Sequence, residues 1–202
     1  MTLLESKFSD VIYLLGLMWV VYAVDLLLPI NLTQFGIGPR EVSGLPGIVM
    51  APLIHAGLGH ILANSLPFLV LGCILQMHGR AVFWQATIII VLASGLCVWL
   101  FSGAGRVVGV SGVIFGYWAF LMAYACFVFS ASSVAVFWRS CKSLLLGIIV
   151  LIFYGTMLFS FFDMRTHISW SGHFFGAVAG VLAAFILAGS AKAEALKYST
   201  QQ

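Results

Sequence analysis

The fold of this chain is decided by the stretch Gly109-Val110-Ser111-Gly112, which opens the apolar run from Val113 to Phe120. A loop of small residues, Ser102-Gly103-Ala104-Gly105, leads into it, so a serine stands where irregular backbone becomes an apolar helix. Irregular backbone is tolerated at membrane depth only where protein buries it or where it lines a water-filled cavity. Small residues are also common where membrane helices pack, so this stretch taken alone favours simple helix packing. The residues that favour a catalytic function lie elsewhere in the chain.

The composition is that of an integral membrane protein. The chain has 202 residues, of which 62% are hydrophobic and 7% are charged, whereas soluble domains are about 25% charged. At about 20 residues per crossing, the chain has room for six spans and for no separate soluble domain. We therefore expect residues 1–202 to form one all-α membrane domain in the lipid bilayer.

Charge and cysteine content exclude several other classes of protein. The net charge is +3 and no basic run occurs, so no nucleic-acid partner is expected. The four cysteines lie within or at the ends of apolar segments without metal-ligand spacing, so we expect neither a metal nor a cofactor. The first apolar run is long enough to span the membrane and has no cleavage site after it, so no signal peptide is expected.

The apolar segments give the order of the chain. Six spans are predicted at residues 11–30, 56–78, 81–101, 111–129, 144–162 and 168–188. The fourth is a central helix that begins at Ser111. Residues 1–10 form a polar start, and residues 190–202 form a polar tail that we expect to be frayed.

The segment at residues 31–54 is too apolar for a solvated loop, which is the alternative. Pro39, Pro46 and Pro52, together with four glycines, prevent a single spanning helix. We predict short pieces that lie in the membrane interface and pack against the bundle.

Polar side chains gather at the start of the second predicted span. His60 and Asn64 are four residues apart, so they lie on the same face of a helix. Such side chains are costly in a membrane and normally face the bundle interior or water. For His60 considered alone, packing at the membrane interface is the alternative to a catalytic role. His55 lies nearer the boundary, and we expect a structural role for it.

A histidine also accompanies a stripe of glycines in the sixth predicted span. Gly172, Gly176 and Gly180 recur every four residues, which allows a neighbouring backbone to approach closely. His173 stands next to this stripe, and Gly112 and Gly116 supply a matching smooth face on the fourth span.

The distribution of basic residues predicts how the bundle is oriented in the membrane. With six spans both termini lie on one side, and the positive-inside rule places that side in the cytoplasm. Six basic residues fall on it and three on the other: Lys7, Arg80, Arg139, Lys142, Lys192 and Lys197, against Arg40, Arg106 and Arg165. Ser111, His60, Asn64 and His173 then share one depth in the outer half of the bilayer.

These four residues supply the groups that an acyl-transfer reaction needs. A serine is a poor nucleophile until a base stands within hydrogen-bond reach, and His173 is the available base. Acyl transfer also needs donors for the oxyanion, and the Asn64 amide, the His60 ring and the Ser111 backbone N–H can supply them.

We expect a dyad rather than a triad. Asp163 lies ten residues before His173, beyond a short loop, and is not placed to orient it. The ring of Phe115, one turn after Ser111, is a plausible surface on which His173 stacks.

Taken together, these motifs resemble those of a known protein family. The set His55, His60 and Asn64, then Gly109-Val110-Ser111-Gly112, then His173-x-x-Gly176-x-x-x-Gly180, resembles the rhomboid intramembrane serine proteases in their minimal six-helix bacterial form. The resemblance covers essentially the whole chain. It implies Ser111 as nucleophile and His173 as base, with His60, Asn64 and the Ser111 amide as the oxyanion hole. Structural support is then expected from His55, Gly109, Gly112, Phe115, Gly116, Gly176 and Gly180.

The same resemblance implies single-span membrane proteins as substrates and a site that opens to the outer face. The sequence shows no transit peptide, which favours a prokaryotic plasma membrane. Because a helical peptide bond is shielded, substrates should carry glycine, proline or other weak helix formers near the cut and a small residue at the cleavage site itself. The fifth span or the interfacial loop would have to move for access, with Phe159, Phe161 and Phe162 as gate candidates. Two departures are visible: Phe115 replaces the tyrosine of several relatives, and Pro39-Arg40 replaces the Trp-Arg pair of some.

Two alternative functions remain. A catalytically idle rhomboid-fold chaperone or adaptor is one, although such proteins typically lack the serine or the histidine that are both present here. A small transporter that uses intramembrane histidines is the other. It would require a continuous polar path, and the inner half of these spans offers almost none.

Overall fold

The computed structural model describes residues 7–103, 105–128, 138, 141–142, 144–146, 148–149 and 170–199. Every regular element within these residues is a helix. Four of the helices are long and apolar enough to cross a membrane: α2 (Ser9–Leu27), α4 (Leu58–Gln76), α5 (Arg80–Phe101) and, within α9 (Trp170–Ser199), its part Trp170–Gly189. The predicted all-α membrane fold is therefore confirmed. These helices match the first, second, third and sixth predicted spans. The fifth falls mostly outside the described residues.

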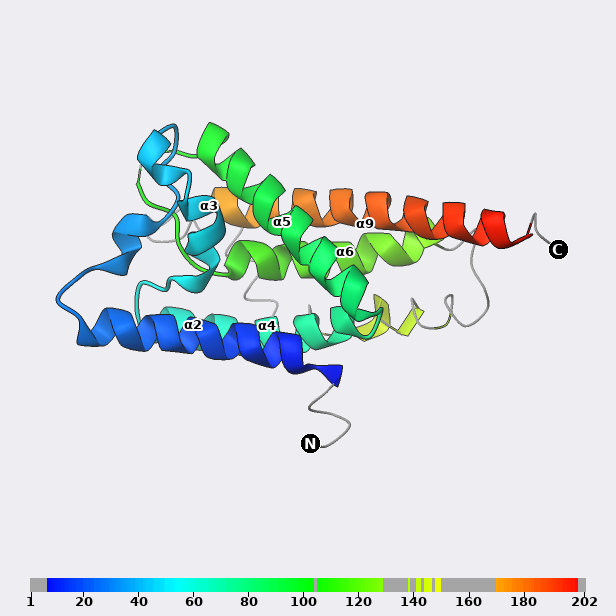
Figure 1. Cartoon of the computed structure of the whole chain (residues 1–202), viewed down its shortest axis with the longest axis horizontal. Helices are drawn as coiled ribbons and strands as arrows, with labels where there is room; N and C mark the ends of the chain where they lie inside the picture. Colours follow the sequence, from blue (N-terminus) through cyan, green and yellow to red (C-terminus); the bar gives the residue numbers. More distant parts are fainter. Residues whose placement is uncertain are drawn as a thin grey trace.

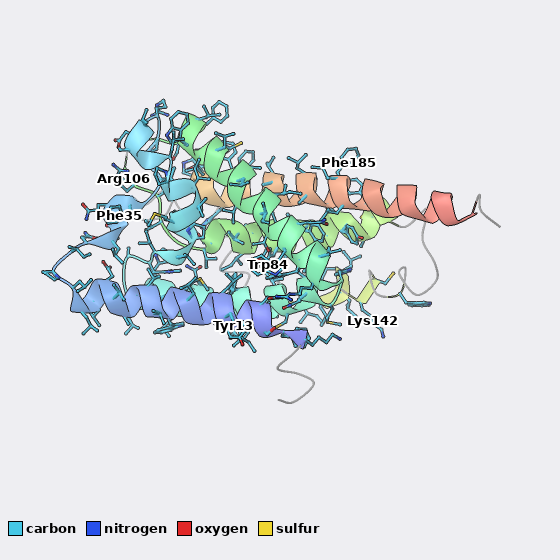
Figure 2. All side chains as sticks on the ribbon, viewed as in Figure 1. Tyr13, Phe35, Trp84, Arg106, Lys142 and Phe185 are labelled. Carbon is cyan, nitrogen blue, oxygen red and sulfur yellow. The ribbon has the colours of Figure 1, made fainter. Side chains whose placement is uncertain are left out.

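The helix that begins at the serine, α6 (Ser111–Val128), occupies the centre of the bundle. It packs against α4, α5 and α9, and Figure 1 shows it running alongside α9. Ile114, Tyr117 and Phe120 of α6 are completely buried. The Tyr117 hydroxyl forms a 2.8 Å hydrogen bond with the Thr87 hydroxyl of α5. Apolar side chains on the outside, such as Tyr13 on α2 and Phe185 on α9, point away from the bundle, as expected for lipid-facing residues (Figure 2).

The segment between α2 and α4 folds into four short helical pieces. They are η1 (Leu32–Phe35), η2 (Val42–Gly44), α3 (Gly47–Met50) and η3 (Ala51–Leu53). Prolines end or open these pieces, and α3 packs against α5. We refer to residues 31–57 as the connecting loop.

The connecting loop holds the backbone that leads to the serine. Ile37 and Val107 pair as an isolated antiparallel bridge with two hydrogen bonds of 2.9 and 3.0 Å. The Gly109 N–H donates to the Ala51 carbonyl at 2.9 Å. The Arg106 guanidinium reaches the Glu41 carboxylate at 2.7 Å. The position of Ser111 therefore depends on residues far earlier in the chain.

Arg40 joins the connecting loop to the end of α5. It has a φ of +60°, a conformation uncommon for residues other than glycine. Its backbone N–H donates to the Trp99 carbonyl at 2.9 Å, and its Nη1 donates to the Ser102 carbonyl at 2.8 Å. The last carbonyls of a helix have no partner within it, so Arg40 caps α5.

The start of the chain differs from the sequence-based expectation of a polar segment up to residue 10. Helix α2 begins at Ser9, and Asp10 is buried at 4% exposure. Its carboxylate accepts hydrogen bonds from Arg80 Nε at 2.8 Å, from Arg80 Nη2 at 2.9 Å and from Gln76 Nε2 at 2.7 Å. A carboxylate is retained in such a place because these charged and amide donors compensate for its burial.

The end of the chain also differs from expectation. Residues 190–199, predicted to be a frayed polar tail, continue α9 as regular helix to Ser199. The reason is local, because the segment is rich in alanine, lysine, glutamate and leucine, which favour helix strongly.

Candidate active site

Ser111 and His173 meet between two helices. Ser111 is the first residue of α6, and His173 lies near the beginning of α9. His173 Nε2 and Ser111 Oγ are 2.9 Å apart, which is hydrogen-bond distance. His173 is 5% exposed, so the contact is largely shielded from surrounding solvent or lipid. This arrangement can transfer the serine proton to the imidazole.

Glycines allow Ser111 and His173 to come this close. A Cβ on Gly176 would lie 2.8 Å from the carbonyl carbon of Gly112, and one on Gly180 would lie 2.9 Å from that of Gly116. A Cβ on Gly112 would in turn lie 2.9 Å from the Gly172 oxygen. Real side chains do not approach so closely, so the backbones of α6 and α9 touch directly along this stripe. Ser111 and His173 stand at its end.

The connecting loop, α4, α5 and α6 enclose a cavity in front of the dyad. Its volume is about 790 Å³, within the range of ligand-binding pockets. The polar groups of His60, Asn64, Ser111 and His173 line one part of it, and Ser94 adds a hydroxyl from α5. Most of the remaining wall is apolar. One cavity therefore brings together all four residues that the sequence predicts to act together.

Two side chains of α4 face the serine loop. A Cβ on Gly109 would lie 2.7 Å from His60 Nε2 and 3.8 Å from Asn64 Nδ2. Gly109 has a φ of +107°, so both the backbone conformation and the closeness of His60 require glycine here. The Ala56 N–H lies 3.5 Å from His60 Nδ1, at the outer limit of a hydrogen bond, and His60 Nε2 is the ring nitrogen that faces Gly109.

The amide of Asn64 is buried with its donor unused. Asn64 is 7% exposed, and its Nδ2 has no hydrogen-bond partner within the described residues. Buried donors are normally paired, so this donor, which lines a cavity, is available to a polar group that enters the cavity. The Ser111 N–H adds a second donor, because the first N–H groups of a helix have no partner within it.

The sequence model of the Rhomboid domain matches residues 43–190, which is most of the chain and includes every residue of this site. This chain belongs to the rhomboid family. It is 36% identical over 199 residues to the uncharacterized protein Rv1337 of Mycobacterium tuberculosis (strain ATCC 25618 / H37Rv), covering 94% of this chain and 79% of that protein. It is 33% identical over 193 residues to the uncharacterized protein ML1171 of Mycobacterium leprae (strain TN), covering 91% and 72%. Rhomboid proteins are typically intramembrane serine proteases.

His55 of this rhomboid domain lies beside His60. It is 1% exposed, and its ring meets that of His60 edge to face, with centroids 5.1 Å apart. Neither ring nitrogen makes a hydrogen bond of good geometry within the described residues. Burial, and then the neighbouring His60, lower the pKa of His55 to about 4, against a smaller opposing effect of the Leu53 backbone. His55 is therefore neutral near pH 7, and its ring packs against that of His60.

The carboxylates that the structure describes are engaged elsewhere. Asp10 binds Arg80, Asp25 Oδ1 accepts from the Leu32 N–H at 2.6 Å, and Glu41 binds Arg106. Asp163 and the gate candidates Phe159, Phe161 and Phe162 lie outside the described residues. Within those residues no group of three histidine, cysteine or acidic side chains is arranged to hold a metal ion.

Sequence reasoning missed one polar contact near the dyad. The hydroxyls of Ser102, just after α5, and of Ser171, in α9, are 2.8 Å apart and buried. Small serines carry no periodic signal, and only the proximity of Ser171 to His173 in the chain could have drawn attention to it.

Proposed function

We propose that this rhomboid-family protein is an intramembrane serine endopeptidase that cleaves transmembrane segments of other membrane proteins. The observation that carries the proposal is the 2.9 Å contact between His173 Nε2 and Ser111 Oγ, made across two helices at the edge of a cavity. Nucleophile and base within hydrogen-bond reach are the signature of an activated serine.

The reaction follows from this contact. Ser111 Oγ attacks the carbonyl carbon of the scissile peptide while His173 Nε2 accepts the hydroxyl proton. The tetrahedral intermediate collapses, the C–N bond breaks, and His173 gives the proton to the leaving amine. Water then attacks the acyl-serine ester with His173 again as base, which releases the carboxyl product and restores the Ser111 hydroxyl.

The negative oxygen of the tetrahedral intermediate needs donors that are in place beforehand. The unpaired Asn64 Nδ2, the ring N–H of His60 and the backbone N–H of Ser111 supply them. All three line or border the cavity of about 790 Å³ in front of the dyad. The absence of an internal partner for Asn64 Nδ2 within the described residues supports this role in particular.

The orientation proposed from the basic residues places both termini in the cytoplasm and the site towards the outer face. In support, the start of α2 and the end of α9 lie at one end of the bundle, and the connecting loop lies at the other (Figure 1). Reporter domains fused to either terminus should be active in the cytoplasm and inactive outside it. Activity of either fusion on the outer side would contradict this orientation.

The enzymatic proposal is tested with the full-length protein reconstituted in liposomes. A fluorophosphonate probe should label the wild type, and Ser111→Ala should abolish the labelling. His173→Ala should reduce both labelling and cleavage of a single-span test substrate that contains glycine and proline near its cut. Ser94→Ala is the matched control, because Ser94 is a hydroxyl in the same cavity but on α5. It should retain labelling.

The alternatives give different results in the same preparation. A correctly folded wild type that is not labelled and binds the test substrate without cutting it would identify an idle adaptor. Ion or solute flux across the liposomes without labelling would identify a transporter. Labelling that persists in Ser111→Ala would remove Ser111 as the nucleophile.

A further inference from the structure

A buried hydrogen bond connects the end of α5 to the beginning of α9. Ser102 Oγ and Ser171 Oγ are 2.8 Å apart, at 8% and 3% exposure. Ser102 is itself held on both sides of its backbone. Its N–H donates to the Val98 carbonyl at 2.9 Å, and its carbonyl accepts from Arg40 Nη1 at 2.8 Å. The Ser171 hydroxyl therefore meets a partner whose position is fixed by α5 and by the connecting loop.

This bond lies next to the proposed base. Ser171 precedes His173 by two residues on α9. Other contacts described for this part of α9 come from α6, through the glycine stripe and the Phe115 ring, and from α5, where the rings of Phe101 and Phe175 lie 5.9 Å apart. The backbone and ring contacts with α6 are not directional, so they fix the separation of α6 and α9 more firmly than the rotation of α9 about its axis. The hydrogen bond to the end of α5 is directional, and it adds to the α5 contacts that oppose this rotation.

We infer that the Ser102–Ser171 hydrogen bond is a positioning contact that holds His173 Nε2 in line with Ser111 Oγ. The inference rests on the proposed hydrolase function. It assigns to two neutral hydroxyls the orienting task that a carboxylate performs in a catalytic triad, but through the backbone of α9 rather than through the ring. Ser102 and Ser171 are positioning residues and touch neither substrate nor the reacting atoms.

The expected effect is on the chemical step. A displacement of about 1 Å in a reacting group can cost about 100-fold in rate. Here the glycine stripe and Phe115 remain, so a loss of about 10-fold in kcat is expected for either alanine variant. KM should change by less than about twofold, since neither serine lines the cavity.

The experiment compares Ser102→Ala, Ser171→Ala, the double variant and Tyr117→Phe with the wild type in liposomes. Tyr117→Phe is the matched control because it removes another buried hydroxyl–hydroxyl bond of 2.8 Å between helices, that with Thr87, away from α9. Four quantities are measured for each protein: kcat and KM on the test substrate, the rate of fluorophosphonate labelling at Ser111, and the midpoint of thermal unfolding.

The expected result is a loss of kcat and of labelling rate in both single variants, with no further loss in the double variant, because the two residues act as one pair. Tyr117→Phe should lower the thermal midpoint and leave kcat near the wild-type value. The inference is overturned if the alanine variants keep kcat within twofold of wild type, or if Tyr117→Phe loses as much kcat as they do. Wild type that is not labelled at Ser111 would instead overturn the proposed function together with the inference.

Discussion

The ring of Phe115 lies against the imidazole of His173, with centroids 4.6 Å apart and planes inclined by 32°. Both residues are buried, and each comes from one of the two helices that the glycine stripe brings together. The aromatic ring thus restrains the imidazole from the side of α6. Such ring pairs contribute about 0.5–1.5 kcal/mol beyond the area they bury.

Replacing this ring should therefore affect catalysis more than folding. We expect Phe115→Leu to lower kcat about 2- to 13-fold, which is the pair energy expressed as a ratio of rates. The control is Phe174→Leu, because Phe174 is adjacent to His173 in the chain but exposed. Steady-state kinetics in liposomes would measure both, and equal effects of the two changes would contradict a specific role for Phe115.

Asn64→Ala tests the oxyanion hole. Removal of one donor typically costs about 10²–10³ in kcat, and the buried Asn64 Nδ2 has no competing partner within the described residues. Cleavage should fall by that amount while KM changes little. A variant with an unchanged kcat would exclude Asn64 from the oxyanion hole even if Ser111 is the nucleophile.

Gly176→Ala tests the contact between α6 and α9. The new methyl group would collide with the Gly112 carbonyl, and forced overpacking costs about 1–3 kcal/mol. Gly189→Ala on the same helix is the control, since nothing lies within 4 Å of a Cβ there. Thermal unfolding in detergent should show a lower midpoint for the first variant and an equal or higher midpoint for the second. The close contact would be disproved by two equal midpoints.

The two ion pairs of the described residues should differ in their contribution to stability. Arg80–Asp10 and Arg106–Glu41 have similar lengths, 2.8 and 2.7 Å, but the side chain of Asp10 is 5% exposed and that of Glu41 is 56% exposed. Asp10→Ala leaves the Gln76 amide without its buried partner and should cost about 1–3 kcal/mol. Glu41→Ala should cost less than about 1 kcal/mol. Chemical unfolding of both variants would measure the difference, and a larger loss for Glu41→Ala would contradict the comparison.

His55 predicts a pH dependence of stability. Its pKa is lowered from 6.5 to about 4 by burial and by His60, so the folded protein binds this proton less readily than the unfolded chain does. The stability that the neutral ring contributes is full above about pH 6.5 and is lost progressively as the pH falls towards 4. His55→Phe has no titratable ring. As the pH falls from 6.5 to about 4, the thermal midpoint of the wild type should therefore fall relative to that of this variant. A constant difference would rule out titration of His55.

Much of the site could be predicted from sequence because regular spacing assigns its residues to helix faces. The four-residue interval of the glycines in α9 and the interval from His60 to Asn64 each fix a helix face without knowledge of the fold. The predicted spans then place the serine, the histidines and the asparagine at one expected membrane depth. For an integral membrane chain of this length, few arrangements remain once these faces are assigned.

The rest depends on contacts that leave no periodic signal. Asp10 stands in a polar segment, so nothing near it in the sequence indicates that Arg80 will cover it. The bridge between Ile37 and Val107 is a single pair of residues, too short to give an alternating pattern. Arg40 adopts a positive φ because its bonds to the end of α5 compensate for the strain, and those bonds join residues about 60 apart in the chain.

The division of the dyad between α6 and α9 has a consequence for biosynthesis. The ribosome makes Ser111 about 60 residues before His173, and membrane helices form before they assemble. A nascent chain therefore carries an inert hydroxyl until α9 has been inserted and has packed along the glycines of α6. Under the proposed function, hydrolytic activity arises only at this last docking step, so an incompletely synthesised or misassembled chain would pose no hydrolytic threat to its neighbours in the bilayer.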